Sequence, residues 1–331
     1  MAGDPSKLKK FQEFGRSEIL FRMVRQPDSS RMLVAASDFK IYDLDPLEKD
    51  AETKEWQGHS SYVTGLKQVG DQVLSASYDG KLIWWNKADG KPVRTVDAHT
   101  KWIRHLDVSA DGKLAASVAD DMVCRLWDTK SGKLLHELRG HDAVTESHFP
   151  SMLYAVAFSP DGKHVATGDR VGKVVVWGTA TGKQETVLET PVMYTWDATA
   201  RIHSIGGIRS LAFSPDGAHL AVGGMGKVGN IDHLGGPSRV ELFDWKKGER
   251  KFEISEDGNK GLVEKIVFHP KGEWLLAAGG DSAGFLQFFD MDKGKAIKQE
   301  KSPMHVYDLD FTPDHSRMYT VGHHKICIWD L

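Results

Sequence analysis

Apolar residues in this sequence gather in short alternating runs, and seven of these runs end in an aromatic residue followed by a small residue. The runs are rich in β-branched and aromatic residues and are too short for helices, as in Val156-Ala157-Phe158 and residues 173–177, so they predict β-strands. Successive endings lie 43, 42, 50, 66, 46 and 40 residues apart. They are Tyr42-Asp43, Trp85-Asn86, Trp127-Asp128, Trp177-Gly178, Phe243-Asp244, Phe289-Asp290 and Trp329-Asp330.

A tight turn recurs upstream of the aromatic endings. Asp and Gly in these turns supply the side-chain-to-backbone hydrogen bonds and the backbone freedom that a hairpin needs. The turns read SADG at 109–112, SPDG at 159–162 and 214–217, HPKG at 269–272, TPDH at 312–315, QPDS at 26–29 and a shortened GDQ at 70–72. Strands, turn and aromatic ending together predict that each unit is a small antiparallel sheet of four strands.

With these turns and endings, the chain resembles the WD-repeat family of β-propellers over nearly its whole length. Three units also carry the family's His dipeptide, at Gly58-His59, Ala98-His99 and Gly140-His141. Phe replaces Trp in the fifth and sixth units, which lack the dipeptide but keep the spacing. The resemblance implies an all-β fold: a seven-bladed β-propeller of four-stranded antiparallel blades, forming a single domain over residues 1–331.

Closure of such a ring needs a strand from the N-terminal end. The sequence stops one residue after the last aromatic ending, so the seventh sheet lacks its outermost strand. Residues 11–14 have the spacing of residues 135–138, an expected outer strand of the third unit. We therefore expect residues of about 8–14 to pair with the C-terminal blade, about 305–331, and to leave no unpaired inner edge.

Composition and charge narrow the classes of function. Lys and Arg number 43 against 46 Asp and Glu, giving a net charge of −3, so there is no basic excess for a nucleic-acid partner. No apolar run approaches the ~18 residues of a membrane span, and no secretory signal is evident, so we expect no membrane partner. The two cysteines, Cys124 and Cys327, are too few for a disulfide framework and fit a reducing compartment. The expected location is cytoplasmic.

Three elaborations interrupt the repeat, near residues 141–152, 186–207 and 223–238. In a four-stranded blade, the turns between strands two and three lie on the same face of the ring as the links between blades. The numbers of residues between the turns and the aromatic endings place all three elaborations on that face. Long loops on a rigid scaffold are where binding usually occurs. Residues 193–196 put large side chains into one elaboration, either as a plug over the ring or as an anchor for a partner.

The resemblance also implies contact positions on this face, beside the start of each inner strand and at the turns between strands two and three. Trp, Tyr and Arg dominate these positions, and these residue types carry most of the binding energy at protein interfaces. The expected partner-binding residues are Tyr62, Tyr78, Trp102, Arg104, Met152, Tyr154, Arg170, Arg209, Glu264, His305 and Tyr307.

Two sets of polar residues resemble the structural hydrogen-bond chain of the family. A hydroxyl nucleophile with His and Asp would use the same residue types. The sets repeat from blade to blade, which an active site does not, so we expect a structural network and no catalytic residue. The sets are His59 with Ser75, Asp79 and Trp85, and His99 with Ser117, Asp121 and Trp127.

The leading interpretation is a non-enzymatic scaffold that binds a protein or peptide partner on the face that carries the elaborations. The remaining histidines show no HxH or CxxC spacing, so we expect neither a metal nor a cofactor. Two alternatives stay open. One is a metal-assisted hydrolase at the channel mouth, where the aligned positions offer Glu264 and Asp120. The other is recognition of a phosphorylated or acidic peptide through Arg104, Arg170 and Arg209.

Overall fold

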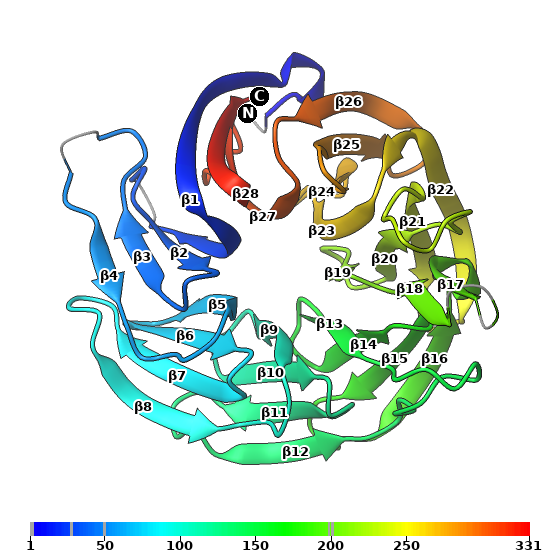
Figure 1. Ribbon diagram of the computed structural model, residues 1–331, viewed down its shortest axis with the longest axis horizontal. Helices are drawn as coiled ribbons and strands as arrows, with labels where there is room; N and C mark the ends of the chain where they lie inside the picture. The colour runs from blue at the N-terminus through cyan, green and yellow to red at the C-terminus, as the bar shows by residue number, and fades with distance from the viewer. Residues whose placement is uncertain (1–2, 27–28, 49–50, 198, 200–201) are drawn as a thin grey trace.

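The computed structural model describes residues 3–26, 29–48, 51–197, 199 and 202–331. Within these residues the chain is mostly β-strand, with two short 3-10 helices, η1 (Pro5–Lys7) and η2 (Pro191–Met193). The sheets stand around a ring, and the first strand of most sheets lies toward the centre (Figure 1). In the described ranges, no helix has the length and apolar character needed to cross a membrane.

Five sheets are four-stranded antiparallel meanders in which consecutive strands pair. The first three consist of β5 (Val63–Val69), β6 (Gln72–Ser77), β7 (Lys81–Asn86) and β8 (Pro92–Asp97); β9 (Ile103–Val108), β10 (Leu114–Ala119), β11 (Cys124–Asp128) and β12 (Leu134–Leu138); and β13 (Leu153–Phe158), β14 (His164–Asp169), β15 (Lys173–Gly178) and β16 (Gln184–Glu189). The other two consist of β19 (Ser210–Phe213), β20 (His219–Met225), β21 (Pro237–Asp244) and β22 (Glu249–Lys260); and β23 (Leu262–Phe268), β24 (Trp274–Gly280), β25 (Gly284–Asp290) and β26 (Ala296–Ser302).

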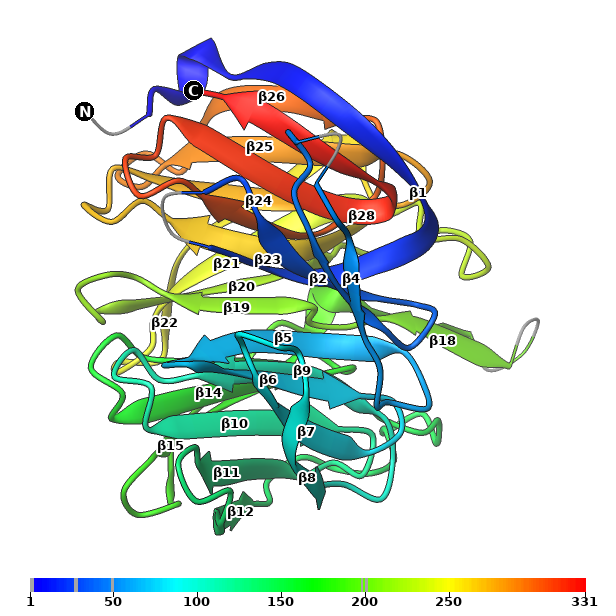
Figure 2. The same cartoon turned by 90° about the vertical axis from the view of Figure 1, so that its left-hand side faces the viewer.

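The sixth sheet joins the two ends of the chain. Its strand order is β27-β28-β1-β2-β3-β4. The strands are β27 (Val306–Phe311), β28 (Arg317–Asp330), β1 (Lys9–Arg25), β2 (Met32–Ala36), β3 (Ile41–Leu44) and β4 (Lys54–Trp56). The first part of β1, from Lys9 to Gly15, pairs antiparallel with β28, and its last part, from Leu20 to Arg25, pairs with β2. Figure 2 shows β1 running beside β28 and continuing to β2.

The predicted number of sheets, seven separate sheets of four strands each, is wrong. Apart from the two-stranded hairpin of β17 and β18, the described ranges form six sheets, five with four strands and one with six. The difference arises because β1 continues through its register shifts without ending, so backbone hydrogen bonds join the first and last units into one sheet. Nothing in the alternating apolar pattern marks whether such a strand is interrupted.

Apolar side chains fill the spaces between neighbouring sheets. One cluster joins Leu33 and Ile41 of the six-stranded sheet to Leu66 and Trp85 of the next sheet. Another cluster packs the two parts of the six-stranded sheet against each other. It contains Leu20, Met23, Met32, Val34, Ala36, Tyr42, Leu44, Tyr319, Val321, Ile326 and Ile328. The core is therefore divided into wedges between sheets, which fixes each inner strand relative to its neighbours.

The predicted turns are built as hairpins. In the turn at 109–112, the backbone N–H of Gly112 donates to Ser109 O over 2.8 Å, and the Ser109 hydroxyl donates to Asp111 Oδ1 over 2.7 Å. Gly112 has φ of 71°, a left-handed conformation that favours glycine. His315 takes the same place in the TPDH turn, with φ of 56°. The central residues of the turn predicted at 26–29, residues 27 and 28, lie outside the described residues.

The three elaborations contact one another. Part of the second forms a hairpin of β17 (Tyr194–Asp197) and β18 (His203–Gly206). The hydroxyls of Ser147, in the first elaboration, and Tyr194 are 2.7 Å apart, and the N–H of Val228, in the third, donates to Thr195 Oγ1 over 3.3 Å. Figure 1 shows the hairpin at the rim of the ring and not over its centre. The elaborations therefore build up one side of the face and leave the ring unplugged by this hairpin.

Candidate functional site: an aromatic and arginine face

Buried hydrogen-bond chains fix the strands below the face. Trp85 Nε1 donates to Ser75 Oγ over 2.7 Å, and the His59 ring lies between Ser75 Oγ, at 2.7 Å, and Asp79 Oδ2, at 2.9 Å. This chain links the second strand of one unit, β6, to the connection before β5, the turn after β6 and the aromatic ending on β7. It satisfies polar groups that would be costly to bury alone.

The second predicted chain has the same form. Trp127 Nε1 donates to Ser117 Oγ over 2.9 Å, and the His99 ring lies 2.7 Å from Ser117 Oγ and 3.0 Å from Asp121 Oδ1. Burial opposes ionisation of Asp121, but hydrogen bonds from His99 and Arg125 outweigh it and hold the pKa of this carboxyl below its usual value. The carboxylate is therefore charged in the folded protein at neutral pH.

A third chain was missed as a network by the sequence reasoning. His141 Nδ1 lies 2.8 Å from Asp169 Oδ2, its Nε2 lies 2.8 Å from Thr167 Oγ1, and Trp177 Nε1 donates to Thr167 Oγ1 over 2.9 Å. The Gly140-His141 dipeptide was the available signal. Thr167, in place of the Ser found in the other two chains, obscured it. Three copies of one arrangement hold strands in register and give no sign of a single reaction centre.

Four aromatic side chains form a continuous row on the face that carries the elaborations. This aromatic row consists of Phe39, Tyr62, Tyr78 and Trp102. Its successive ring centroids are 5.9, 5.7 and 4.8 Å apart, and the Tyr78 and Trp102 planes lie within 2° of each other. Phe39, Tyr62 and Trp102 are 41%, 42% and 51% exposed, which makes the row an apolar surface open to solvent.

The four residues of the row lie at corresponding positions in neighbouring units. Phe39 lies in the turn between β2 and β3, and Tyr78 follows β6 in the turn before β7. Tyr62 and Trp102 immediately precede the inner strands β5 and β9. The row also touches Phe21 of β1, whose ring centroid is 5.7 Å from that of Tyr62. Phe21 and Phe39 were missed because the contact positions were transferred to the second and later units only.

Arg104 supports the row from beneath. Its guanidinium forms a two-bond ion pair with Asp120, with distances of 2.8 and 2.6 Å, and Nη1 donates to the Tyr78 hydroxyl over 2.7 Å. The same group lies 5.1 Å from the Trp102 ring centroid and 5.5 Å from that of Tyr154. Burial opposes the charge on Arg104, but Asp120 outweighs it and raises the pKa of the guanidinium. Arg104 is thus engaged within the protein, and it positions the rings that a partner would meet.

The other two arginines of the predicted set differ from each other. Arg170 Nη1 donates to Pro150 O over 3.3 Å and Nη2 donates to Ser204 O, so this side chain ties two elaborations together. Arg209 lies 3.5 Å above the Tyr154 ring, and its Nη1 is buried without a hydrogen-bond partner within the described part of the chain. Of the three arginines proposed for an acidic peptide, two are held by protein groups.

Met152 and Tyr154 connect the two arginine environments. The Tyr154 hydroxyl lies 2.8 Å from Met152 Sδ, and Arg104 Nη2 lies 3.6 Å from the same sulfur. Both side chains are half-buried. They extend the packed surface from the aromatic row toward Arg209.

Glu264, His305 and Tyr307 lie deeper than a contact role requires. His305 is 2% exposed, its Nδ1 lies 3.0 Å from Asp281 O, and its Nε2 lies 3.6 Å from Glu264 Oε1. Tyr307 is half-buried, with its hydroxyl 3.2 Å from His323 Nε2. Burial opposes ionisation of Glu264, but His305 outweighs it and lowers the pKa of that carboxyl. His305, a predicted contact residue, is thus buried, because Asp281 and Glu264 of the neighbouring sheet pack against its ring.

This face presents side chains that a partner could contact, and the two carboxylates considered for a metal site are already engaged by other residues. A hollow of about 400 Å³ lies beside the row, between Tyr78, Trp102, Asp79, Lys101 and Asp120. Both carboxylates that a metal-assisted hydrolase would use are engaged, Asp120 by Arg104 and Glu264 by His305. In the part of the chain that the structure describes, no group of three or more His, Cys, Asp or Glu side chains is placed to hold a metal ion.

Comparison with known proteins gives a family match and partial relatives. The sequence profile described as "WD domain, G-beta repeat" matches more than half of the chain, at residues 51–86, 90–128, 132–178, 197–228 and 297–330. WD repeat-containing protein SL1-17 of Schistosoma mansoni is 26% identical over 227 residues, covering 68% of this chain and 63% of that protein. Nuclear distribution protein PAC1-2 of Uncinocarpus reesii is 31% identical over 171 residues, covering 48% and 35%. Apoptotic protease-activating factor 1 of Homo sapiens is 28% identical over 220 residues, covering 63% and 16%. The matches span less than two thirds of the length of each of these relatives.

Proposed function

The chain belongs to the WD domain, G-beta repeat family, and from that premise we propose that it is a non-enzymatic scaffold that binds a protein or peptide partner at the aromatic row. Members of this family are typically scaffolds without enzymatic activity. The observation that carries the proposal is the contact between three exposed rings, Phe39, Tyr62 and Trp102, through Tyr78.

The energetic argument rests on preorganisation. Burying one large apolar side chain contributes ~1.5–3 kcal/mol, and aromatic rings are frequent at the centres of interfaces. Side chains that are mobile before binding lose entropy when a partner immobilises them. Here Arg104, paired with Asp120, already holds Tyr78 and Trp102 in place, so binding at these two rings costs less entropy on this side.

We further propose that the six-stranded sheet acts as two blades, so that the ring counts seven units in a single domain over residues 1–331. The apolar cluster that packs Tyr319 and Val321 against Met32 and Val34 supports this, because it resembles the clusters between neighbouring sheets. The pairing of residues 9–15 with β28 would then complete the last blade. A cytoplasmic location is supported by Cys124 and Cys327, both of which are buried free thiols.

One observation favours an acidic or phosphorylated peptide as the partner. Arg209 keeps a buried N–H without a partner in the described ranges, beside the Tyr154 ring. Binding through this group would weaken as salt is raised from 50 to 300 mM. An apolar partner on the row would respond much less to salt.

The test is affinity purification with mass spectrometry, comparing the wild-type chain with Trp102→Ala and Tyr62→Ala. Leu135→Ala is the matched control, because Leu135 is 45% exposed and lies on an outer strand away from the row. We expect the same proteins to be lost with both row variants and retained with the control. Equal capture by all four folded proteins would refute the proposal.

A further inference from the structure

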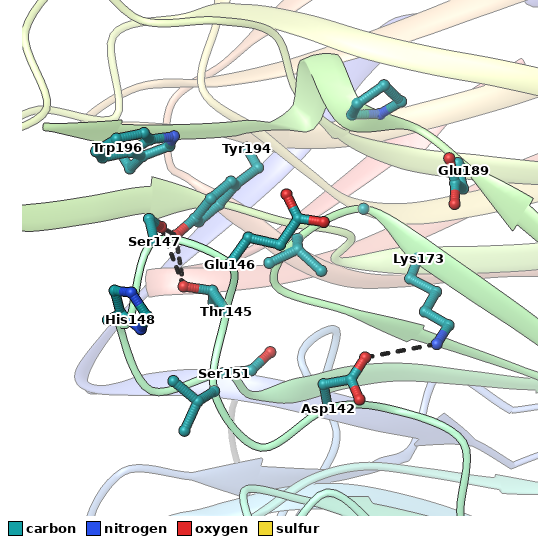
Figure 3. Close-up of a pocket in the computed structure, with 14 residues that line it drawn as sticks. Asp142, Thr145, Glu146, Ser147, His148, Ser151, Lys173, Glu189, Tyr194 and Trp196 are labelled. Atoms are coloured by element: carbon teal, nitrogen blue, oxygen red, sulfur yellow. Dashed lines mark hydrogen bonds and ion pairs between the residues drawn. The ribbon is translucent and has the colours of Figure 1, made fainter.

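A second recess lies on the elaborated face, apart from the aromatic row. It has a volume of about 920 Å³ and lies between the loop at 141–152 and the hairpin of β17 and β18. Figure 3 shows Tyr194 and Trp196 of the hairpin facing Ser147 and His148 of the loop. Ligand sites in proteins occupy about 300–1,000 Å³, so the recess has room for several peptide residues.

The walls of the recess are held in place before any ligand binds. The hydroxyls of Thr145, Ser147 and Tyr194 form a closed ring of contacts, at 3.0, 2.7 and 3.2 Å. Side chains alternate along a strand, so Tyr194 and Trp196 share one face of β17 while Thr195 faces the other way and accepts a hydrogen bond from Val228. The hairpin is thus attached on both faces.

Exposed apolar side chains stand at the mouth. Val144 is 55% exposed and Trp196 is 50% exposed, and both line the recess together with Val171 and Pro191. A large apolar side chain of a partner would remove these surfaces from water.

The charge of the recess is unbalanced. Its lining has three carboxylates, Asp142, Glu146 and Glu189, and one ammonium, Lys173. Lys173 Nζ lies 3.7 Å from Asp142 Oδ2, as the dashed line in Figure 3 marks. The side-chain carboxylates of Glu146 and Glu189 make no hydrogen bond or ion pair with any described residue. Two negative charges therefore remain for a positively charged ligand.

A buried hydroxyl also lacks a partner here. Ser151 is 5% exposed, lines the recess, and its Oγ makes no hydrogen bond within the described ranges. A buried polar group without a partner costs free energy that a ligand can recover by bonding to it.

We propose that this recess binds an extended peptide segment of a partner protein that carries Lys or Arg beside a large apolar side chain. The apolar residue packs against Val144 and Trp196, and the basic residue approaches Glu146 and Glu189. Exposed charges of this kind act mainly on specificity and association rate. The inference extends the proposed scaffold role, because it adds a second surface and the chemistry of what binds there.

The test is selection of a phage-displayed library of random twelve-residue peptides on the full chain. We expect enriched peptides to carry Lys or Arg next to Leu, Ile, Phe or Trp. A synthesised enriched peptide should bind about tenfold more weakly, by fluorescence anisotropy, to Trp196→Ala and to the double variant Glu146→Gln with Glu189→Gln. The control double variant, Glu48→Gln with Glu249→Gln, makes the same charge change outside the recess and should bind like the wild type.

Three outcomes overturn the inference: no enrichment over beads without protein, enrichment of acidic peptides, or binding that the recess variants leave unchanged. Trp102→Ala separates this inference from the proposed function. If Trp102→Ala alone abolishes peptide binding, the peptides bind the aromatic row, and the recess proposal fails while the scaffold proposal stands. If the recess variants alone abolish it, the recess proposal holds whatever the row binds.

Discussion

Tyr78 and Trp102 stack with their ring centroids 4.8 Å apart and their planes within 2° of parallel, although they come from different sheets. Arg104 contacts both rings and bonds to Asp120 in the same cluster. The order of the Tyr78 and Trp102 rings therefore depends on the ion pair between Arg104 and Asp120.

Loss of the Arg104 guanidinium should disorder this surface. Arg104→Ala leaves the half-buried Asp120 without its partner, and we expect a loss of about 2 kcal/mol in the free energy of unfolding, measured by urea denaturation. Arg104→Lys should recover little, because an ammonium cannot make the two parallel bonds. Equal stability of Arg104→Lys and the wild type would show that charge alone, without geometry, supports the row.

Removal of one hydroxyl should weaken a buried chain. Ser117→Ala leaves the Trp127 N–H and the His99 Nε2 without their shared partner, so we expect a loss of about 1–3 kcal/mol in the free energy of unfolding. Ser60→Ala, at an exposed position, is the matched control and should stay within about 0.5 kcal/mol of the wild type. A neutral Ser117→Ala would contradict the structural role of the chain.

Stability should fall in acid partly through Asp121. The pKa of this carboxyl is lower in the folded chain than its usual value of 3.8, so the unfolded chain takes up a proton first as the pH drops. The stabilisation is complete well above pH 4 and is lost as the pH falls below about 4 toward the folded-state pKa. Unfolding free energies measured from pH 6 to pH 3 should decline more steeply for the wild type than for Asp121→Asn. Parallel curves would exclude this carboxyl as a source of the decline.

The N-terminal part of β1 should be essential for stability. Deleting residues 1–14 removes most of the partner of β28 and exposes an unpaired strand edge, so we expect the melting temperature to drop by roughly 10 °C. Deleting residues 1–3 alone should have a small effect. Similar melting temperatures for both deletions would mean that the pairing adds little.

Both cysteines should resist modification in the folded protein. Burial raises the pKa of Cys124 and raises that of Cys327 to about 12, so neither is a thiolate at pH 8. A colorimetric thiol reagent should find both thiols only after guanidinium is added. Rapid reaction in native buffer would show that the strands near one cysteine open readily.

The sequence alone predicted much of the repeat architecture. Alternating apolar runs, Asp-Gly turns and the ending at Trp127-Asp128 are local patterns, and each encodes a strand or turn within a few residues. The partners of His59 could also be named, because the family resemblance implied them and the Ser-Asp-Trp spacing of four and then six residues recurs in the next unit. Phe21 and Phe39 were missed because the contact positions of the family were transferred to the second and later units only.

The amino-acid order by itself therefore determined the repeating strands and their turns, since these depend on short-range periodicity, and the resemblance to the WD-repeat family implied two of the three polar chains. Only the tertiary structure decided that β1 fuses the first and last units, that Arg104 pairs with Asp120, and that His305 is covered. It also brought the loop at 141–152 against Tyr194 to enclose a recess. These features arise between segments far apart in the chain, where packing of neighbouring sheets and loops, and not the pattern within any one repeat, sets which side chains meet.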